Sequence, residues 1–310
     1  MRQFETPPQA AWVGNPQGGV STPDPILLPD PAVRFKRTAA RLADLANDHP
    51  MSDWLLFLCN LSQAQHEAAQ AIQPPLPDAG IVAKTAAAGM PPLAADGHRR
   101  DAAWREALRR LLERFDGAEG VPEALAAVVA DLKGRSEADL EALADAFLGG
   151  SLPPEQAGHS LFIAAALQVY FTCLAASLSV ADLHLLPERN LCPCCGSTSV
   201  SSLVTASGKT PGVRYLNCSL CSTAWNHVRA VCITCGQSGK LAVRGIEGQE
   251  EEASIKAETC DDCHTYSKSL YLAKDTEIDP YADDLASLGL DLLVSEAGWA
   301  RHAPNPFLLG

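Results

Sequence analysis

The chain lacks an excess of positive charge. Its 310 residues include 24 Lys and Arg against 37 Asp and Glu, which gives a formal net charge of −13. Proteins that bind nucleic acids need a basic surface to neutralise phosphates, so the balance argues against a nucleic-acid partner. The basic residues of the cysteine-rich part of the chain are scattered and form no run: Lys209, Arg214, Arg229, Lys240 and Arg244.

The start of the chain lacks an export signal. Residues 1–29 are rich in Pro, Gly and Gln, and they contain no apolar core of the kind that a signal peptide needs. No twin-arginine motif follows. We therefore expect an irregular N-terminal arm over residues 1–29 and a cytoplasmic protein whose thiols stay reduced.

One stretch has the length of a membrane span but lacks the flanks of one. Residues 161–180 run for 20 positions without a formal charge. The nearest charged neighbours are Glu155 and Asp182, whereas membrane spans are usually flanked by basic residues. We predict a buried central helix and no membrane insertion. Cys173 inside it, like Cys59, is expected to be an unreactive core thiol.

Signatures of catalysis are missing too. We find no nucleophile–base pair and no phosphate-binding glycine loop in the sequence, so we predict that the protein is not an enzyme. The acids Asp283, Asp284 and Asp291 fall in a predicted helix, where acids near the start favour the helix dipole.

What the chain does contain is cysteine in a regular pattern. Eight of its 11 cysteines form four C-x-x-C pairs. Glycine follows the first and third pairs but not the second and fourth, and corresponding pairs lie 40 and 42 positions apart. This alternation indicates an internal duplication. The pairs are Cys192/Cys195, Cys218/Cys221, Cys232/Cys235 and Cys260/Cys263.

The spacing of these cysteines is typical of metal ligands. Two thiolates on one tight turn can face one ion, and two such turns complete a tetrahedral four-sulfur site. Gly196 and Gly236 suit a positive φ that curls the chain around the sulfur. Adjacent pairing, in which the first two pairs share one metal and the last two share another, gives each repeat one pair of each kind. We favour it over a cross-braced arrangement.

Three other interpretations of the cysteines are weaker. Structural disulfides need an oxidising compartment, and thioredoxin-like redox pairs need a βαβ unit that the sequence does not show. Residues 260–264 match the c-type haem pattern C-x-x-C-H, but haem would remove the fourth pair from the repeat. We expect His264 to be a surface residue and Cys194 to be a bystander between two ligands.

The elements around the cysteines predict an α+β multidomain fold. Residues 30–186 show helical spacing of apolar residues between Pro and Gly stops and predict an all-α domain. Residues 187–229 and 230–272 alternate short Val-, Leu- and Thr-rich stretches with turns, which predicts two tandem zinc-ribbon modules. Residues 273–310 should form a C-terminal helix, from Asp279-Pro280 to about Ala297, and a tail.

The cysteine-rich half resembles the formate dehydrogenase accessory protein FdhE family. The resemblance is specific from about residue 187 to the end of the chain, and it covers the helical half only in type and length. The segments that carry it are residues 192–196, 214–221, 225–229, 258–263, 282–286 and 305–308.

The resemblance implies a function that spacing does not show. Members of this family are cytoplasmic, non-enzymatic factors for respiratory formate dehydrogenase, and they contact its molybdenum- and selenocysteine-containing catalytic subunit. Their C-x-x-C pairs are described as rubredoxin-like and iron-binding, which favours iron over zinc. Two alternatives stay open: an iron protein that transfers or senses electrons, and a zinc-ribbon nucleic-acid binder.

Contacts with the catalytic subunit are expected where the ribbons meet the helical domain. Trp225, His227 and Arg229 are the candidate contact residues, because Trp and Arg are over-represented in binding hot spots. The alternative for Trp225 is packing inside its own ribbon.

Overall fold

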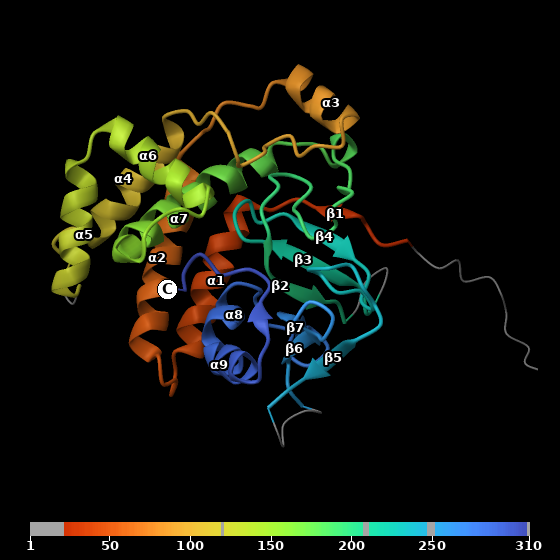
Figure 1. The fold of residues 1–310 in the computed structure, drawn as a ribbon. Coiled ribbons are helices and arrows are strands. Elements are labelled where there is room, and N and C mark those ends of the chain that lie inside the picture. The colour runs from red at the N-terminus through yellow and green to blue at the C-terminus, as the bar shows by residue number, and fades with distance from the viewer. Residues whose placement is uncertain (1–21, 119–120, 207–210, 247–251, 309–310) are drawn as a thin grey trace, which may run out of the picture.

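The computed structural model describes residues 22–118, 121–206, 211–246 and 252–308. Residues 1–21 of the predicted arm, and Lys209, lie outside these ranges. Within them, a short strand at Ile26–Leu27 is followed by helices over the rest of the first half, by strands over the second half, and by two helices and a last short strand at the end (Figure 1). The mixed helix-and-sheet class is therefore confirmed.

Two helices of the first half begin at capping residues that the sequence makes recognisable. Asp30 caps the first helix, since its Oδ1 accepts a hydrogen bond of 2.9 Å from the backbone N–H of Ala32, and Pro31 follows at the first helical position. Ser136 caps a later helix in the same way. The elements are α1 (Pro31–Leu45), α2 (Ser52–Ala71), α3 (Ala79–Ala87), α4 (Ala103–Phe115), α5 (Glu123–Gly134), α6 (Glu137–Leu148), α7 (Ala157–Ala176) and the short 3-10 turns η1 (Pro154–Gln156) and η2 (Val180–Asp182).

Helix α3 was not predicted, because its stretch is rich in Pro, Ala and Gly. Asp78 supplies the signal that we missed: its side chain accepts a hydrogen bond from the N–H of Ile81 and caps the helix. The chain that leaves α3 then crosses to the strands. The N–H groups of Leu93 and Ala95 donate to the carbonyls of Cys194 and Cys195 at 2.9 Å and 2.8 Å.

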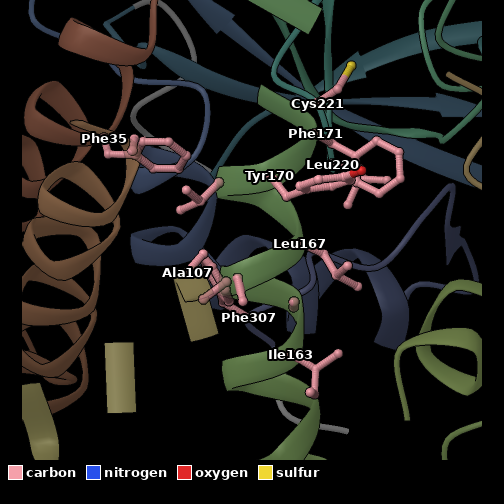
Figure 2. Packing of buried hydrophobic residues seen from close by; sticks show 14 of the residues in the cluster. Phe35, Ala107, Ile163, Leu167, Tyr170, Phe171, Leu220, Cys221 and Phe307 are labelled. Carbon is pink, nitrogen blue, oxygen red and sulfur yellow. The ribbon is translucent and has the colours of Figure 1, made fainter. Parts of the chain in front are cut away.

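Helix α7 is the central helix of the molecule. Figure 2 shows α7 with Phe35 of α1 and Ala107 of α4 on one side, and with Leu220 of the cysteine-rich half beside Phe171. The segment Pro154–Ala176 is long and apolar enough to cross a membrane by length and composition, yet 78 % of its window is buried inside the protein. The burial agrees with the predicted core helix.

The strands of the second half form one sheet rather than two separate modules. Each ribbon contributes an antiparallel three-stranded unit, and the parallel pairing of β2 with β7 joins the two units, so that Ser202 lies opposite Ser269. The strand order is β1-β4-β3-β2-β7-β6-β5, with β8 beside β7. The strands are β1 (Ile26–Leu27), β2 (Ser199–Val204), β3 (Arg214–Cys218), β4 (Ala224–His227), β5 (Leu241–Arg244), β6 (Ile255–Cys260), β7 (Thr265–Tyr271) and β8 (Ala300–Arg301).

The end of the N-terminal arm is more ordered than we expected. Ile26 and Leu27 form strand β1, which pairs with β4 so that Ile26 lies opposite Trp225. Ile26 is buried. The buried side chain of Ile26 packs at the edge of the sheet, and this contact holds the end of the arm in place.

The C-terminal region forms two short helices instead of one. α8 (Ala282–Ala286) and α9 (Leu288–Glu296) are separated at Ser287. Asp283, Asp284 and Asp291 do more than favour a helix dipole, because all three are buried and paired with cations. Their partners are Arg41 for Asp283, and Lys268 and Arg301 for both Asp284 and Asp291.

The two ribbons pack into two apolar clusters of different size. The main core includes residues of α1, α2, α4 and α7, and it continues into the first ribbon through Leu216, Leu220 and Trp225. A second, small cluster joins the second ribbon to α9, and its buried members are Ala257, Tyr266, Leu290 and Val294. The first ribbon is thus part of the helical core, whereas the second has a small core of its own.

Candidate metal centres

The first candidate metal centre is formed by Cys192, Cys195, Cys218 and Cys221, which we call the first site. All four sulfurs lie within 4.8 Å of one another. Cys192 Sγ is 3.5 Å from Cys221 Sγ, and Cys195 Sγ is 3.4 Å from Cys218 Sγ. A tetrahedron with metal–sulfur bonds of about 2.3 Å has edges of roughly 3.8 Å, so the four sulfurs fit one ion.

The second candidate centre, the second site, repeats this arrangement with Cys232, Cys235, Cys260 and Cys263. These sulfurs also lie within 4.8 Å of one another. The distance is 3.7 Å from Cys232 Sγ to Cys263 Sγ, and 3.8 Å from Cys235 Sγ to Cys260 Sγ. The predicted adjacent pairing is confirmed, because each group of four combines two consecutive C-x-x-C pairs.

The residue that follows each C-x-x-C pair has a positive φ in all four cases. Gly196 and Gly236 have φ of +77° and +74°, as predicted. Ser222 and His264 follow the second and fourth pairs, and they too have positive φ, at 61° and 53°. Positive φ is uncommon for residues with a side chain. The turn around the sulfurs therefore imposes the conformation even where glycine is absent.

Hydrogen bonds to the sulfurs favour thiolates at the first site. The N–H of Cys194 lies 3.4 Å from Cys192 Sγ, and the N–H groups of Leu220 and Cys221 lie 3.4 Å from Cys218 Sγ. Burial raises the pKa of Cys192 and of Cys218 well above the ordinary value. Four buried thiolates therefore need a positive charge among them, and a divalent or trivalent metal supplies it.

A threonine hydroxyl accompanies one sulfur of each site. Thr223 Oγ1 is 3.2 Å from Cys221 Sγ, and Thr265 Oγ1 is 3.1 Å from Cys263 Sγ. The sequence contains the signal, because both threonines stand two positions after the last cysteine of their ribbon. The signal is weak, because threonine is common in strands for reasons unrelated to cysteine.

The two sites differ in exposure. None of the first four cysteines is more than 1 % exposed. At the second site, Cys232 and Cys260 are buried, but Cys235 and Cys263 are only half-buried. The helical domain causes part of this difference, because the segment after α3 bonds to the first pair. A methyl group at Gly196 would come within 3.3 Å of Pro91 Cγ.

Three cysteines lie outside the two groups of four, and two of them, Cys59 and Cys173, are in the helical half. Cys59 is buried, and burial raises its pKa. Burial raises the pKa of Cys173 to about 11. Such thiols are poor nucleophiles at neutral pH, which agrees with their interpretation as core residues. Cys194 is buried in the first pair, and its exposed fraction is 0 %.

The three candidate contact residues differ in how much of their surface is exposed. Trp225 is buried, and its Nε1 donates a hydrogen bond of 2.9 Å to the carbonyl of Arg189. His227 is buried as well, while Arg229 is exposed. A side chain without exposed surface cannot touch a partner in this conformation. Packing inside the ribbon is therefore the role that the structure gives Trp225, and Arg229 alone of the three offers surface.

His227 belongs to a buried polar cluster around Arg214. The Arg214 guanidinium is fully buried, with Nη2 lying 2.8 Å from His227 Nδ1 and donating to the carbonyl of Val231. Its Nη1 pairs with Glu258 of the second ribbon. Burial, together with the nearby Arg214 charge, lowers the pKa of His227 to about 4. This cluster ties the two ribbons together beside the second site.

Family models match nearly all of the described chain. The model described as FdhE, N-terminal, matches residues 23–187. The model described as FdhE, central domain, matches residues 191–229, and the model described as FdhE, C-terminal domain, matches residues 230–308. The central and C-terminal models divide the cysteines so that each contains one site.

Curated relatives and a solved structure agree with these models. The chain is 40 % identical to a protein FdhE homolog of Edwardsiella ictaluri over 92 % of this chain and 91 % of that one. It is 37 % identical to protein FdhE of Escherichia coli K12 over 92 % and 91 % of the two chains. The crystal structure of the FdhE protein from Pseudomonas aeruginosa matches with a TM-score of 0.83 at 34 % identity, over 92 % of this chain and 98 % of that one. The chain therefore belongs to the FdhE family.

Proposed function

We propose that the protein is a non-enzymatic accessory factor for the maturation of respiratory formate dehydrogenase, and that it binds the catalytic subunit of that enzyme in the cytoplasm. Membership of the FdhE family carries the proposal. The family resemblance supplies the client, the molybdenum- and selenocysteine-containing subunit.

The chemistry of the two sites supports a factor without turnover of its own. Four thiolates complete a tetrahedral metal, so neither site offers a vacant position for a substrate. The first site also lies inside the main core, where no substrate has access. Both features suit metals that stabilise a docking module.

Either iron or zinc suits four thiolates, because both metals accept tetrahedral sulfur sites. The family resemblance favours iron at all eight ligands: Cys192, Cys195, Cys218, Cys221, Cys232, Cys235, Cys260 and Cys263. Elemental analysis of the purified protein, with an absorption spectrum, decides between the two metals. Two metal equivalents per chain are expected, and thiolate-bound ferric iron would give strong visible bands that zinc cannot give.

A cleft beside the second site is the client surface that we propose. Its volume is about 530 Å³, and it lies between the linker at residues 187–190 and the third cysteine pair. Val228, on its wall, is 61 % exposed, and the exposed Arg229 follows directly. An exposed apolar side chain next to an arginine is the composition expected of a contact patch.

The test is recovery of the catalytic subunit with the tagged protein from cytoplasmic extract. We expect Arg229→Glu to reduce recovery at least about ten-fold, because a lost contact of 1.4 kcal/mol changes affinity ten-fold. Lys84→Glu makes the same charge change at an exposed position of α3 and should leave recovery unchanged. Equal recovery with both variants would remove this cleft from recognition, and failure to recover the subunit with the parent protein would remove the client.

A redox role is the second candidate, and the partial exposure of Cys235 and Cys263 favours it at the second site. Electrons reach a metal more readily when its ligands touch solvent. A reversible change of visible absorbance on reduction, confined to one metal equivalent, would support this role. The structure adds no support for binding to nucleic acid, and the net charge of −13 argues against it.

A further inference from the structure

The sheet has two edges, and only one of them is covered within the described part of the chain. At one end of the strand order, β1 pairs with β4, and at the other end lies β5 (Figure 1). No described strand lies beyond β5. The first strand of the other ribbon is β2, and β7 pairs with its outer edge. The second ribbon therefore presents an edge that is filled in the first.

Hydrogen bonds fix which backbone groups of β5 face the sheet. The N–H of Asp261 donates to the carbonyl of Lys240 at 3.1 Å, just before the strand begins. In an antiparallel pair, the residues that exchange hydrogen bonds alternate with residues that do not. The register of β5 with β6 continues without a shift, so Ala242 and Arg244 also direct their N–H and C=O groups toward β6.

The same alternation directs the N–H and C=O groups of Leu241 and Val243 away from β6. No described residue forms a hydrogen bond to these outward groups. The Val243 side chain is exposed as well, at 58 %. A row of unpaired strand groups is a template on which a further strand can form. The outer edge of β5 can therefore accept an extended peptide segment.

Arg244 indicates the chemistry that such a segment should carry. Its Nε donates to Thr259 Oγ1 at 3.0 Å, and its guanidinium carbon lies 4.3 Å from the centroid of the Trp299 ring. The side chain is exposed and has no acidic partner among the described residues. Lys240, four positions earlier, already pairs with Asp262. A carboxylate on the added strand can therefore form an ion pair with Arg244.

An apolar groove continues this edge beyond Arg244. It has a volume of about 460 Å³ and lies between the end of β5, the turn that joins α1 to α2, and the corner of α8 and α9. Ile246 and Leu292 on its wall are 45 % and 60 % exposed. The apolar side chains of the lining are Met51, Ile246, Ile255, Leu288 and Leu292. A segment that pairs with β5 can place an apolar side chain there.

A second copy of this chain fits the edge poorly. Two β5 strands that paired antiparallel through Leu241 and Val243 would set Lys240 of each copy opposite Arg244 of the other. Like charges directly opposite each other destabilise a strand pair. Charged side chains on edge strands are also a common protection against such pairing. An acidic strand meets no such repulsion from Arg244, so the edge favours a different molecule over a copy of itself.

We propose that the outer edge of β5 binds an extended acidic segment of a partner protein, which joins the sheet as an added strand. Leu241 and Val243 supply the backbone hydrogen bonds, Arg244 pairs with a carboxylate, and the groove at Ile246 receives an apolar side chain. This surface shares no lining residue with the cleft at residues 187–190. The proposal depends on neither the formate dehydrogenase subunit nor the choice of metal.

Hydrogen exchange at single amides tests the geometry. The experiment uses the full chain loaded with zinc, which is diamagnetic, and follows exchange by NMR. We expect the Val243 amide to exchange at least about ten-fold faster than those of Ala242 and Arg244, which bond to β6. The probe is an acetylated peptide of eight residues in which Val and Glu alternate. Saturation with this peptide should slow exchange at Val243 at least about ten-fold.

A matched peptide with Lys in place of Glu tests the predicted charge. Titration followed at the Val243 amide gives both affinities at this edge alone. The Glu peptide should bind at least about ten-fold more tightly, as expected when one contact contributes 1.4 kcal/mol. Arg244→Glu should reverse the preference, whereas Lys84→Glu makes the same charge change on α3 and should preserve it. Equal affinities of the parent for the two peptides would overturn the proposal.

Val243→Pro tests the backbone contact. Proline removes an outward N–H and leaves the hydrogen bonds of Ala242 and Arg244 to β6 in place, and edge strands tolerate it at such positions. The Glu peptide should lose at least about ten-fold in affinity, measured by calorimetry, while Val243→Thr keeps the N–H and should bind like the parent.

Separate outcomes would contradict strand addition. Unchanged affinity in a folded Val243→Pro variant would overturn it, and if that variant does not fold, the charge reversal at Arg244 decides. Protection of the Val243 amide that rises with protein concentration in the absence of peptide would assign the edge to a second copy of the chain. That result would overturn the proposal of an acidic partner.

Discussion

The two ribbons repeat the same strands, turns and four-sulfur geometry, but different parts of the molecule surround them. The first site is covered on all sides, since its cysteines belong to the same apolar core as α7. The second rests on a cluster of four buried side chains, and two of its cysteines are half-buried. The two ribbons thus share one four-cysteine arrangement, but packing makes the first a part of the helical core and leaves the second near the surface.

Loss of a ligand should separate the two sites most strongly. We expect Cys218→Ser to unfold the helices together with the first ribbon, because structural zinc contributes about 10–16 kcal/mol in small domains, as much as a whole domain's stability. The corresponding change in the second repeat, Cys260→Ser, should spare the helices. Circular dichroism at the helix wavelength during heating measures this. Equal loss of helix in both variants would show that the ribbons are equally integrated.

The second-largest difference should be the rate at which a chelator removes the metal from each site. The two metals should leave in separate phases, and we expect the first site to release its metal at least about 100-fold more slowly, at a rate set by unfolding of the core. Stopped-flow transfer to a chromophoric chelator gives both rates. To assign the phases, the measurement is repeated on Cys260→Ser, which should have lost the fast phase. A single common rate would contradict the difference in exposure.

Arg214→Met should cost about 3–5 kcal/mol of unfolding free energy, because it leaves the Glu258 carboxylate, whose side chain is only 10 % exposed, without its charged partner. The control is Arg244→Met on β5, where the guanidinium is exposed and lies over the Trp299 ring; it should cost less than about 1 kcal/mol. Denaturant unfolding measures both. In the double variant Arg214→Met with Glu258→Leu, much of the loss should return, and failure to recover would point to the other Arg214 contacts.

His227 predicts a dependence of stability on pH. Its pKa is about 4 in the folded chain and about 6.5 when unfolded, so the unfolded chain binds the extra proton between these values. Stability from this residue is therefore complete above pH 6.5 and falls as the pH drops toward 4. His227→Asn keeps an acceptor for Arg214 without the titration. Its unfolding free energy should fall less steeply over this range than that of the parent, and parallel curves would contradict the assignment.

The smallest effect is expected from Cys194. Cys194→Ala should keep both metal equivalents and lose on the order of 1 kcal/mol, about the contribution of one small buried group. Cys192→Ala in the same turn should lose one equivalent. Elemental analysis of the two variants gives the answer, and a metal deficit in Cys194→Ala alone would assign Cys194 as a ligand.

The sequence predicted local features well because local chemistry determines them. C-x-x-C spacing places two thiols on one turn, and the repeat then specifies which pairs combine. Asp30-Pro31 and Ser136 fix helix starts through hydrogen bonds to their own neighbours. The short Val-, Leu- and Thr-rich stretches of residues 187–229 and 230–272 predicted strands in both ribbons, and strands form there. Strand β6 was missed, since its residues IKAETC include two charged side chains and one Ala.

Contacts between distant residues could not be predicted in the same way. Nothing local indicates that β2 pairs with β7, or that Asp284 takes Arg301 as its partner. Asp283 and Asp284 looked like ordinary acids at the start of a helix, and only the fold shows that they are buried among cations. His302 is a similar case, because Thr234 lies far before it in the chain and their contact depends on the whole second ribbon.

Strand β1 has a consequence for the order in which the protein is made. Ile26 leaves the ribosome early, but its partner Trp225 follows only after almost 200 further residues. At about 5–20 residues per second, the segment ahead of α1 waits roughly 10–40 s for the strand that it covers. During that interval the growing helical half can bury its own apolar faces, while the side of α7 that meets the first ribbon stays open. Nascent chains should therefore be most vulnerable to proteases until residue 225 has emerged and the first metal is bound.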